Sequence, residues 1–217
     1  GVVTEVTVKI LKTPEVIKAA LIGFSSIEDA GNCVAQIIAK GCIPAGMEIM
    51  DKALLKATND FCKAGYPTEA EAMMIIEFDG SEFEVESHIK TAERIAKENN
   101  SSSIKISQSN EERLKFWSGR KAAFPACGVL APDYMCMDGS IPRGKLAEVL
   151  NEITRLSKKY DLPVANAFHA GDGNLHPLIM FDANDKNSLK KCEDFGADIL
   201  KYCVKVGGAL TGEHGVG

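Results

Sequence analysis

The 217-residue sequence has no apolar run near the 18 residues that a membrane-spanning helix requires, no signal peptide and no concentrated block of one charge sign. Its 30 acidic and 25 basic residues are interspersed and give a net charge of −5. Nucleic acids and anionic membranes bind concentrated basic surfaces, so the charge pattern argues against both as partners. The remaining composition, 45% apolar and 25% charged, is ordinary for a globular domain with a core.

Disulfide chemistry is not indicated either. The seven cysteines are an odd number, and no two have the Cys-x-x-Cys spacing of thiolate zinc sites and redox centres. We therefore expect reduced thiols in a cytoplasmic compartment. No low-complexity linker divides the chain, which favours one structural unit.

Apolar residues recur with strand and helix periods in turn, which predicts an α+β fold. The apolar run 19–24 precedes the cap signal Ser25-Ser26-Ile27-Glu28 and a helical period that lasts to Gly41, and the run 72–78 precedes a second cap at Ser81 and another helix. Further strands are expected at 44–50, 103–107 and 133–138, a hairpin over 163–181, and further helices at 52–64, 110–123 with a stop at Pro125, 144–159 and 187–205. This order predicts a duplicated ferredoxin-like plait, with helices on one face of antiparallel sheets.

Three of the four histidines lie in two glycine-rich segments near the end of the chain. The first segment reads His169-Ala170-Gly171-Asp172-Gly173-Asn174-Leu175-His176, and its Asp-Gly pair between two apolar runs predicts a two-residue hairpin turn. Such a turn places His169 directly opposite His176 on one face, with Cβ atoms about 4.5–5.5 Å apart. Two imidazoles at that separation can bind one cation through bonds of about 2.0–2.1 Å.

The second segment, Thr211-Gly212-Glu213-His214-Gly215-Val216-Gly217, adds an acid and a base in a flexible run. The Glu213 carboxylate would complete a three-ligand site with open positions, the pattern of catalytic rather than structural metal centres. His214 would then be left to act as a base. The alternative is that His169 and His176 form an unliganded cross-strand pair and that the glycines serve only tight turns.

These segments, together with Phe116-Trp117-Ser118-Gly119-Arg120-Lys121 and Asp133-Tyr134-Met135-Cys136-Met137-Asp138-Gly139-Ser140-Ile141-Pro142, closely resemble the C-terminal domain of FAD-linked oxidases. The resemblance runs the whole length of the chain and is greatest in the group of glycolate oxidase, D-lactate dehydrogenase and D-2-hydroxyglutarate dehydrogenase. It implies a two-part flavoprotein, in which a ferredoxin-like substrate domain covers the flavin ring held by an amino-terminal FAD-binding domain.

The resemblance also implies domain limits. Residues 1–10 resemble the last strand of the FAD-binding domain, so Gly1, Val2 and Val3 are the candidate flavin contacts of this chain. Residues 11–217 resemble the substrate and metal domain, cut short at its carboxyl end. The sequence begins in an alternating run of Val and Thr and stops inside a glycine loop, and we expect it to be a piece of a longer protein.

Five site residues receive roles from the resemblance. His169, His176 and Glu213 would ligate a divalent metal, His214 would act as the base, and Arg120 would bind the substrate carboxylate. Two imidazoles and one carboxylate suit zinc, manganese or iron. The FAD would accept the hydride from the substrate. From the residues alone, Arg120 would be taken as a solvated helix position.

The substrate implied is a small D-2-hydroxy acid such as glycolate or D-lactate. Relatives that act on a dicarboxylate carry lysine at the position of Cys136 and asparagine at that of Leu178, and both polar contacts are missing here. Expected partners are the FAD-binding domain of the same protein and, by the same resemblance, an iron–sulfur electron-acceptor subunit. Such partner subunits could hold the protein at the periphery of a membrane.

Two other readings remain open at this stage. One is a metallohydrolase or metal-binding module that uses the same His, His and Glu set to activate water without a flavin. The other is an interaction domain with no activity of its own.

Overall fold

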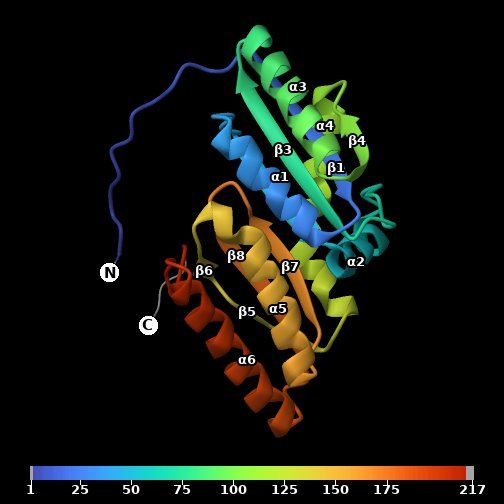
Figure 1. Cartoon of the computed structure of the whole chain (residues 1–217), viewed down its shortest axis with the longest axis vertical. Helices are drawn as coiled ribbons and strands as arrows, with labels where there is room; N and C mark the ends of the chain where they lie inside the picture. Colours follow the sequence, from blue (N-terminus) through green and yellow to red (C-terminus); the bar gives the residue numbers. More distant parts are fainter. Residues whose placement is uncertain (1, 214–217) are drawn as a thin grey trace.

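Across residues 2–213, which the computed structural model describes, eight strands form one antiparallel sheet with helices packed against it (Figure 1). The strands are β1 Val16–Phe24, β2 Gly46–Asp51, β3 Ala72–Gly80, β4 Ser101–Ile106, β5 Asp133–Cys136, β6 Gly139–Ser140, β7 Val164–His169 and β8 Asn174–Phe181. The helices are α1 Ile27–Ala39, α2 Lys52–Cys62, α3 Glu82–Glu98, α4 Asn110–Ala126, α5 Leu146–Tyr160 and α6 Lys186–Lys205, with short 3₁₀ turns η1 Cys127–Val129 and η2 Arg143–Lys145. The predicted α+β class is confirmed.

The strands β1 to β4 and the helices α1 and α3 form the first ferredoxin-like plait. The strand order β4-β1-β3-β2 is that of a βαββαβ unit, with α2 inserted between β2 and β3. The cap of α3 at Ser81 is the predicted one, whereas α1 is capped by Ser26, one residue later than the capping box Ser25-Ser26-Ile27-Glu28 predicts. The Ser26 hydroxyl accepts a hydrogen bond from the Asp29 backbone N–H, and Ser81 and Glu84 form a reciprocal capping box.

The second half repeats this arrangement over β5, β7 and β8 with α5 and α6. The strand order is β7-β8-β5, and Ala209 makes an isolated antiparallel bridge to Ser140 at the edge where the fourth strand of a plait lies. The antiparallel sheets of the two plaits are continuous, because β2 pairs with β7 and joins them into one sheet. Glu48 lies directly opposite His169 in this pair. The pairing also gives backbone hydrogen-bond partners to β2 and β7, which would otherwise be edge strands.

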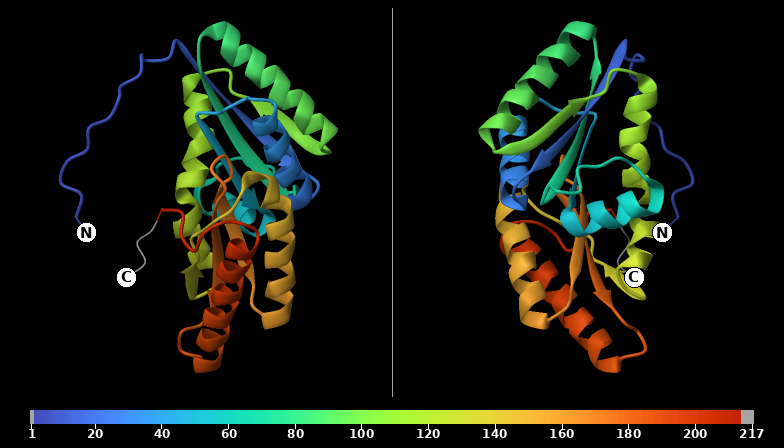
Figure 2. Two further views of the ribbon diagram at one scale, coloured as in Figure 1. Left: turned by 60° about the vertical axis from the view of Figure 1, so that its left-hand side comes forward. Right: turned by 90° about the vertical axis from the view of Figure 1, so that its right-hand side faces the viewer.

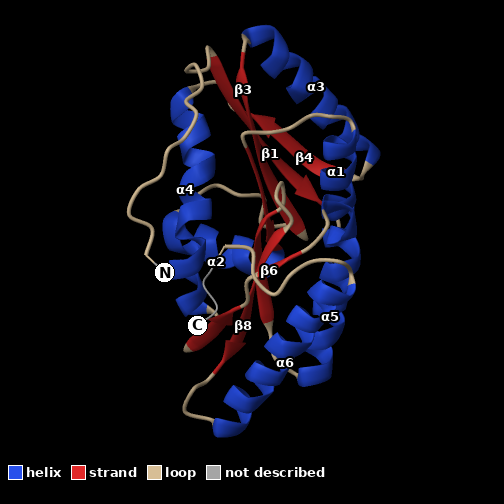
Figure 3. Ribbon diagram, turned by 90° about the vertical axis from the view of Figure 1, so that its left-hand side faces the viewer, coloured by secondary structure: helices blue, strands red, loops and turns tan. Residues whose placement is uncertain are grey.

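Helices cover both faces of the sheet, which corrects the expectation that they lie on one face. The helices α1, α3, α5 and α6 pack on the first face, and α2 and α4 pack on the second (Figure 3). The reason is visible in β1, where Ala20 and Ile22 belong to the first core while Ala19 and Leu21 belong to the second. A strand buried on both faces has a continuous apolar run, as 19–24 does.

The amino-terminal segment 2–14 forms no strand, so the strand expected in residues 1–10 is not found in the described part of that range. Its side chains are largely exposed, and Figure 2 shows the segment running outside the packed layers. An isolated strand is unstable because its backbone groups need a neighbouring strand as partner, and no described strand pairs with this one.

The helices otherwise follow the predicted limits, with one difference in α4. This helix continues through Pro125 to Ala126 instead of stopping at the proline. Proline at this point costs only one backbone hydrogen bond of the last turn, and the burial of Ala126 and Cys127 holds the turn in place. Among the described helices, none is both long and apolar enough to cross a membrane.

Candidate metal centre

The hairpin of β7 and β8 carries His169 and His176 on the same face, although not directly opposite each other as predicted. The observed register pairs His169 with Asn174, so four residues rather than two form the loop. The backbone N–H groups of Asp172 and Gly173 both donate to the His169 carbonyl, at 3.0 and 3.1 Å. Because the register differs from the predicted one by an even number of residues, the histidines remain on one face as diagonal neighbours, with ring centroids 5.0 Å apart.

Glu213 from the carboxyl-terminal loop joins the two histidines. Its Oε1 lies 2.7 Å from His176 Nε2 and 3.5 Å from His169 Nε2, and candidate ligand atoms of all three residues lie within 4.8 Å of one another. Ligand atoms around a tetrahedral ion with bonds of about 2.1 Å are roughly 3.4 Å apart. The three groups can therefore reach one cation with small movements. His214, the predicted base, lies outside the described residues.

Glu48 on β2 is a site residue that the sequence reasoning missed. Its Oε1 lies 2.6 Å from His169 Nδ1, and its Oε2 accepts a hydrogen bond of 3.0 Å from Arg120 Nε. The available signal was a lone carboxylate in the apolar strand Met47-Glu48-Ile49-Met50, where the period of two places it on the same face as Met50.

Asp138 holds the loop that carries Glu213. Its Oδ2 accepts hydrogen bonds from the Thr211 hydroxyl at 2.6 Å, the Gly212 N–H at 3.2 Å and the Glu213 N–H at 3.1 Å. Its other oxygen lies 3.9 Å from His176 Nδ1. Asp138 therefore links Glu213, the acid of the cluster, to His176, a role that its position in the sequence did not reveal.

Arg120 reaches the cluster from α4, and its side chain is buried rather than solvated. It is 9% exposed and is tied to Glu48. Arg113 and Trp117, seven and three residues earlier on the same helix face, both donate to Glu77 on β3, at 2.8 and 2.6 Å. Two sheet carboxylates thus hold α4 over the second face, and one of them belongs to the histidine cluster.

The electrostatics of the cluster separate the two histidines. The hydrogen bond with Glu48 raises the pKa of His169, whereas burial and the nearby charge of His169 lower the pKa of His176. His176 is consequently favoured as a neutral imidazole with an available lone pair. Burial raises the pKa of the neighbouring Cys136 thiol to about 11, so this sulfur is not a thiolate ligand at neutral pH.

The proposed flavin contacts are not brought to this cluster. Val2 and Val3 are 90% and 79% exposed in the amino-terminal segment, and Gly1 lies outside the described residues. Their predicted role in cofactor binding stays a prediction.

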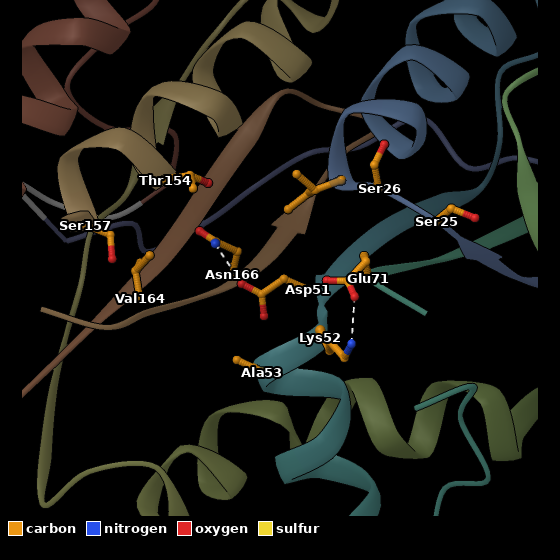
Figure 4. A pocket seen from close by; sticks show the side chains of 11 residues that line it. Ser25, Ser26, Asp51, Lys52, Ala53, Glu71, Thr154, Ser157, Val164 and Asn166 are labelled. Atoms are coloured by element: carbon orange, nitrogen blue, oxygen red, sulfur yellow. Dashed lines mark hydrogen bonds and ion pairs between the residues drawn. The ribbon is translucent and has the colours of Figure 1, made fainter. Parts of the chain in front are cut away.

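A separate cavity of about 400 Å³ opens on the other side of the sheet, between the start of α1 and the end of α5 (Figure 4). Its polar groups mostly bind one another. Asn166 donates to the Asp51 carboxylate at 2.8 Å, and Lys52 pairs with Glu71 at 2.6 Å. Asp51 also accepts from the Leu54 N–H as the cap of α2. The size of this cavity does not make it the functional site, because its charged groups serve helix capping and ion pairing.

The fold is shared with the solved structures of an oxidase, a methylhydroxylase and a synthase. It matches 4-ethylphenol oxidase from Gulosibacter chungangensis with a TM-score of 0.65 and 13% identity, covering 92% of this chain and 46% of that one. It matches p-cresol methylhydroxylase with a TM-score of 0.65 and 15% identity, covering 91% and 45%. Alkyldihydroxyacetonephosphate synthase matches with a TM-score of 0.63, 14% identity and coverages of 92% and 41%. At these identities the likeness defines the class of fold alone.

Sequence similarity then identifies the family. Residues 13–217 match the family model "FAD linked oxidases, C-terminal domain", and the chain belongs to this family. It is 50% identical to glycolate oxidase subunit GlcD of Escherichia coli strain K12 and 36% identical to glycolate oxidase subunit GlcD of Bacillus subtilis strain 168, over all of its own length. A probable mitochondrial D-lactate dehydrogenase of Danio rerio is 28% identical. The chain spans only 44 to 46% of these three relatives.

Proposed function

We propose that this chain is the substrate- and metal-binding part of an FAD-dependent oxidoreductase that oxidises a small D-2-hydroxy acid to the 2-oxo acid. The observation that carries the proposal is the meeting of His169, His176 and Glu213 beside the buried Arg120. Family membership and the names of the relatives support the redox class. The reaction removes the hydroxyl proton and transfers the C2 hydrogen with its electron pair to the flavin.

A divalent cation would lower the pKa of the substrate hydroxyl, and FAD would accept the hydride. The residues that would hold the cation are His169, His176 and Glu213, and their donor set suits zinc, manganese or iron. Arg120 would bind the substrate carboxylate through the guanidinium nitrogens that do not face Glu48. His214 would take the hydroxyl proton, since an imidazole with a pKa near 6.5 can accept a proton at neutral pH.

The proposed preference for glycolate or D-lactate rests on two apolar positions. Cys136 on β5 and Leu178 on β8 are cross-strand partners, so the two departures seen in the sequence lie side by side. Leu178 is fully buried, and the protonated Cys136 thiol brings no charge. A wall of this kind offers no partner to a second carboxylate, and burying an unpaired carboxylate is costly. A substrate with one carboxylate is therefore favoured.

The proposed partners follow from the part of the relatives that the chain does not cover. An FAD-binding domain of the same protein would bring the flavin to the cluster. The E. coli relative is named as a subunit of glycolate oxidase, which supports further chains in the assembly, and an iron–sulfur subunit would accept the electrons. Attachment to a membrane would then occur through such chains.

The test of the activity uses the whole protein purified with its flavin. We expect anaerobic addition of glycolate or D-lactate to bleach the flavin absorbance, and D-2-hydroxyglutarate to do so with a KM at least tenfold higher. A colourless whole protein that hydrolyses esters would instead support a metallohydrolase.

The test of the ligands uses metal content. We expect the double variant His169→Ala, His176→Ala to retain less than a tenth of the zinc, manganese or iron bound by the wild type. His88→Ala is the matched control, since His88 on α3 packs against Phe78 rather than in the cluster. Equal metal content in the double variant and the wild type would refute the assignment.

A further inference from the structure

Glu48 is an unusual residue for its position. It lies in β2 between Met47 and Ile49, and only 9% of its surface is exposed. Removing a carboxylate from water is costly unless charged or hydrogen-bonding partners replace the solvent. Glu48 therefore needs partners that compensate its burial.

Two cationic or hydrogen-donating groups meet this one carboxylate, one on each oxygen. His169 Nδ1 lies 2.6 Å from Oε1, and Arg120 Nε donates to Oε2 at 3.0 Å. The two partners have different proposed tasks, since His169 would bind the cation and Arg120 would bind the substrate. The single side chain of Glu48 thus connects the two halves of the proposed site through one close polar contact with each.

The sheet fixes this geometry. Glu48 on β2 and His169 on β7 are directly opposite in the antiparallel register, and Arg120 comes down on the same face from α4. Directly opposite residues have Cβ atoms about 4.5–5.5 Å apart, which leaves little freedom in the His169 ring once its Nδ1 is bonded.

We propose that Glu48 is a positioning residue that prepares both His169 and Arg120. With Nδ1–H donated to Glu48, the neutral His169 keeps its lone pair on Nε2, the nitrogen that faces Glu213. Carboxylates that bond the distal nitrogen of a metal-binding histidine fix its tautomer and ring orientation. The same carboxylate fixes the Arg120 side chain at the edge of the cluster. This inference rests on the proposed function of the cluster.

The alternative is that Glu48 has a purely structural role and only anchors α4. Glu77 is a second carboxylate that anchors the same helix, and it serves as the comparison. Glu77 on β3 accepts hydrogen bonds from Arg113 and Trp117 of the same helix, and its side chain is 15% exposed against 11% for Glu48. Glu77 is therefore a partly buried carboxylate that anchors the helix, and its partners Arg113 and Trp117 include no histidine. Glu48→Gln and Glu77→Gln remove one charge each from comparable ion pairs, which makes them a matched pair.

The experiment measures the dissociation constant of zinc by competition with a chromophoric chelator, using the whole protein stripped of metal. We expect Glu48→Gln to weaken zinc binding by about 10- to 100-fold, the usual effect of losing such a partner. We also expect it to raise the KM for glycolate or D-lactate through Arg120. Glu77→Gln should leave zinc affinity within twofold of the wild type. It should lower the melting temperature by about as much as Glu48→Gln does.

Outcomes separate the two proposals. A wild type that binds no divalent metal would overturn the metal centre and the role of Glu48 with it. If the wild type binds zinc and folded Glu48→Gln binds it equally well, the role of Glu48 alone is overturned. Should Glu48→Gln fail to fold, Glu48→Asp decides, because it keeps the charge but cannot reach both partners. We expect Glu48→Asp to bind zinc more weakly, and wild-type affinity would overturn the inference.

Discussion

At the scale of single residues, two carboxylates of this sheet differ in the groups that replace their lost contact with solvent. Glu48 faces a guanidinium and an imidazole, whereas Asp51, three residues later, is met by neutral donors, the Asn166 amide and the Leu54 N–H. Neutral donors compensate desolvation less fully than cations do. Burial accordingly raises the pKa of Asp51 to about 6.

The first prediction concerns Asp51→Asn. A folded-state pKa of about 6 against an unfolded value near 3.9 means that the folded protein binds the additional proton between these values, so stability falls as pH rises from about 4 to about 6. Asparagine caps a helix as well as aspartate does and has no charge to bury. Because Asp51 keeps some contact with solvent, we expect the free energy of unfolding of Asp51→Asn to exceed that of the wild type by about 1–2 kcal/mol at pH 7.5. At pH 4 the two proteins should be almost equally stable. Urea unfolding of both proteins over this range measures it, and a pH-independent difference would contradict it.

The residues of the cluster could be predicted from the sequence only in part. His169 and His176 are seven positions apart in one hairpin, so a local pattern was enough to place them on one face despite the wrong register. The contact of Glu48 with His169 spans 121 positions and depends on the pairing of two strands from different plaits. No local pattern contains that register, which explains why Glu48 was missed.

At the scale of elements, the loop between β7 and β8 depends on Gly173. Its φ is +75°, in the left-handed region that favours glycine, and a Cβ added there would overlap the carbonyl oxygen of Ile141. The Asp-Gly signal was therefore a correct sign of a tight loop. The loop is longer than predicted, since the Gly171 N–H donates to the Met47 carbonyl of β2 at 3.1 Å instead of pairing with β8. Gly173 occupies the last position of the loop, where its carbonyl accepts from the Ile141 N–H at 2.8 Å.

The second prediction is that Gly173→Ala destabilises the protein by about 2–4 kcal/mol, since strained backbone and a steric clash coincide. The measurement is the free energy of unfolding in urea. Gly144→Ala is the matched control, because a Cβ at Gly144 meets no atom within 4 Å, and it should change stability by less than about 0.5 kcal/mol. Similar effects of the two substitutions would refute the role of the loop geometry.

The third prediction concerns the loop 211–213, which Asp138 holds by three hydrogen bonds. Without these bonds the loop that carries Glu213 has to become ordered when the cation binds. The conformational entropy lost in that ordering weakens cation binding. We expect Asp138→Ala to weaken zinc binding by at least tenfold in the chelator titration. Asp133→Ala is the control, because Asp133 accepts a bond from the Ala183 N–H in a different loop. An unchanged zinc affinity in Asp138→Ala would show that the loop is ordered without this anchor.

Most elements were predictable because caps and apolar periods are local signals. The helix α3 is capped by Ser81 as expected and α1 by Ser26, one residue after the expected cap, and the plait order follows from the alternation of elements. The second helical layer was not predicted, since a continuous apolar strand such as β1 gives no sign of which helix covers which face. The position of α4 is set by ion pairs with Glu48 and Glu77, which only the folded sheet brings within reach.

At the scale of the whole molecule, the cluster draws on both plaits. The histidines come from the hairpin of the second plait, Glu48 comes from the first, and Arg120 comes from the helix α4 that follows the first plait in sequence. The pairing of β2 with β7 and the close packing of Gly31 against Ala147 between α1 and α5 join the halves. The second plait and the loop that follows it supply the three candidate ligands, whereas Glu48 and Arg120, which contact the cluster, come only from the first half of the chain.

The last prediction concerns the 217-residue chain as a separate protein. The chain covers 44% of the E. coli glycolate oxidase subunit, and the hydride acceptor of the proposed reaction is a flavin that a further domain would bind. We expect the purified chain to fold, to bind zinc through the cluster and to be colourless, with no oxidation of glycolate or D-lactate in the presence of an artificial electron acceptor. The whole protein should carry out the reaction under the same conditions. Turnover by the separate chain, abolished by His169→Ala, would mean that its own residues suffice and that the division of labour proposed for the two domains is wrong.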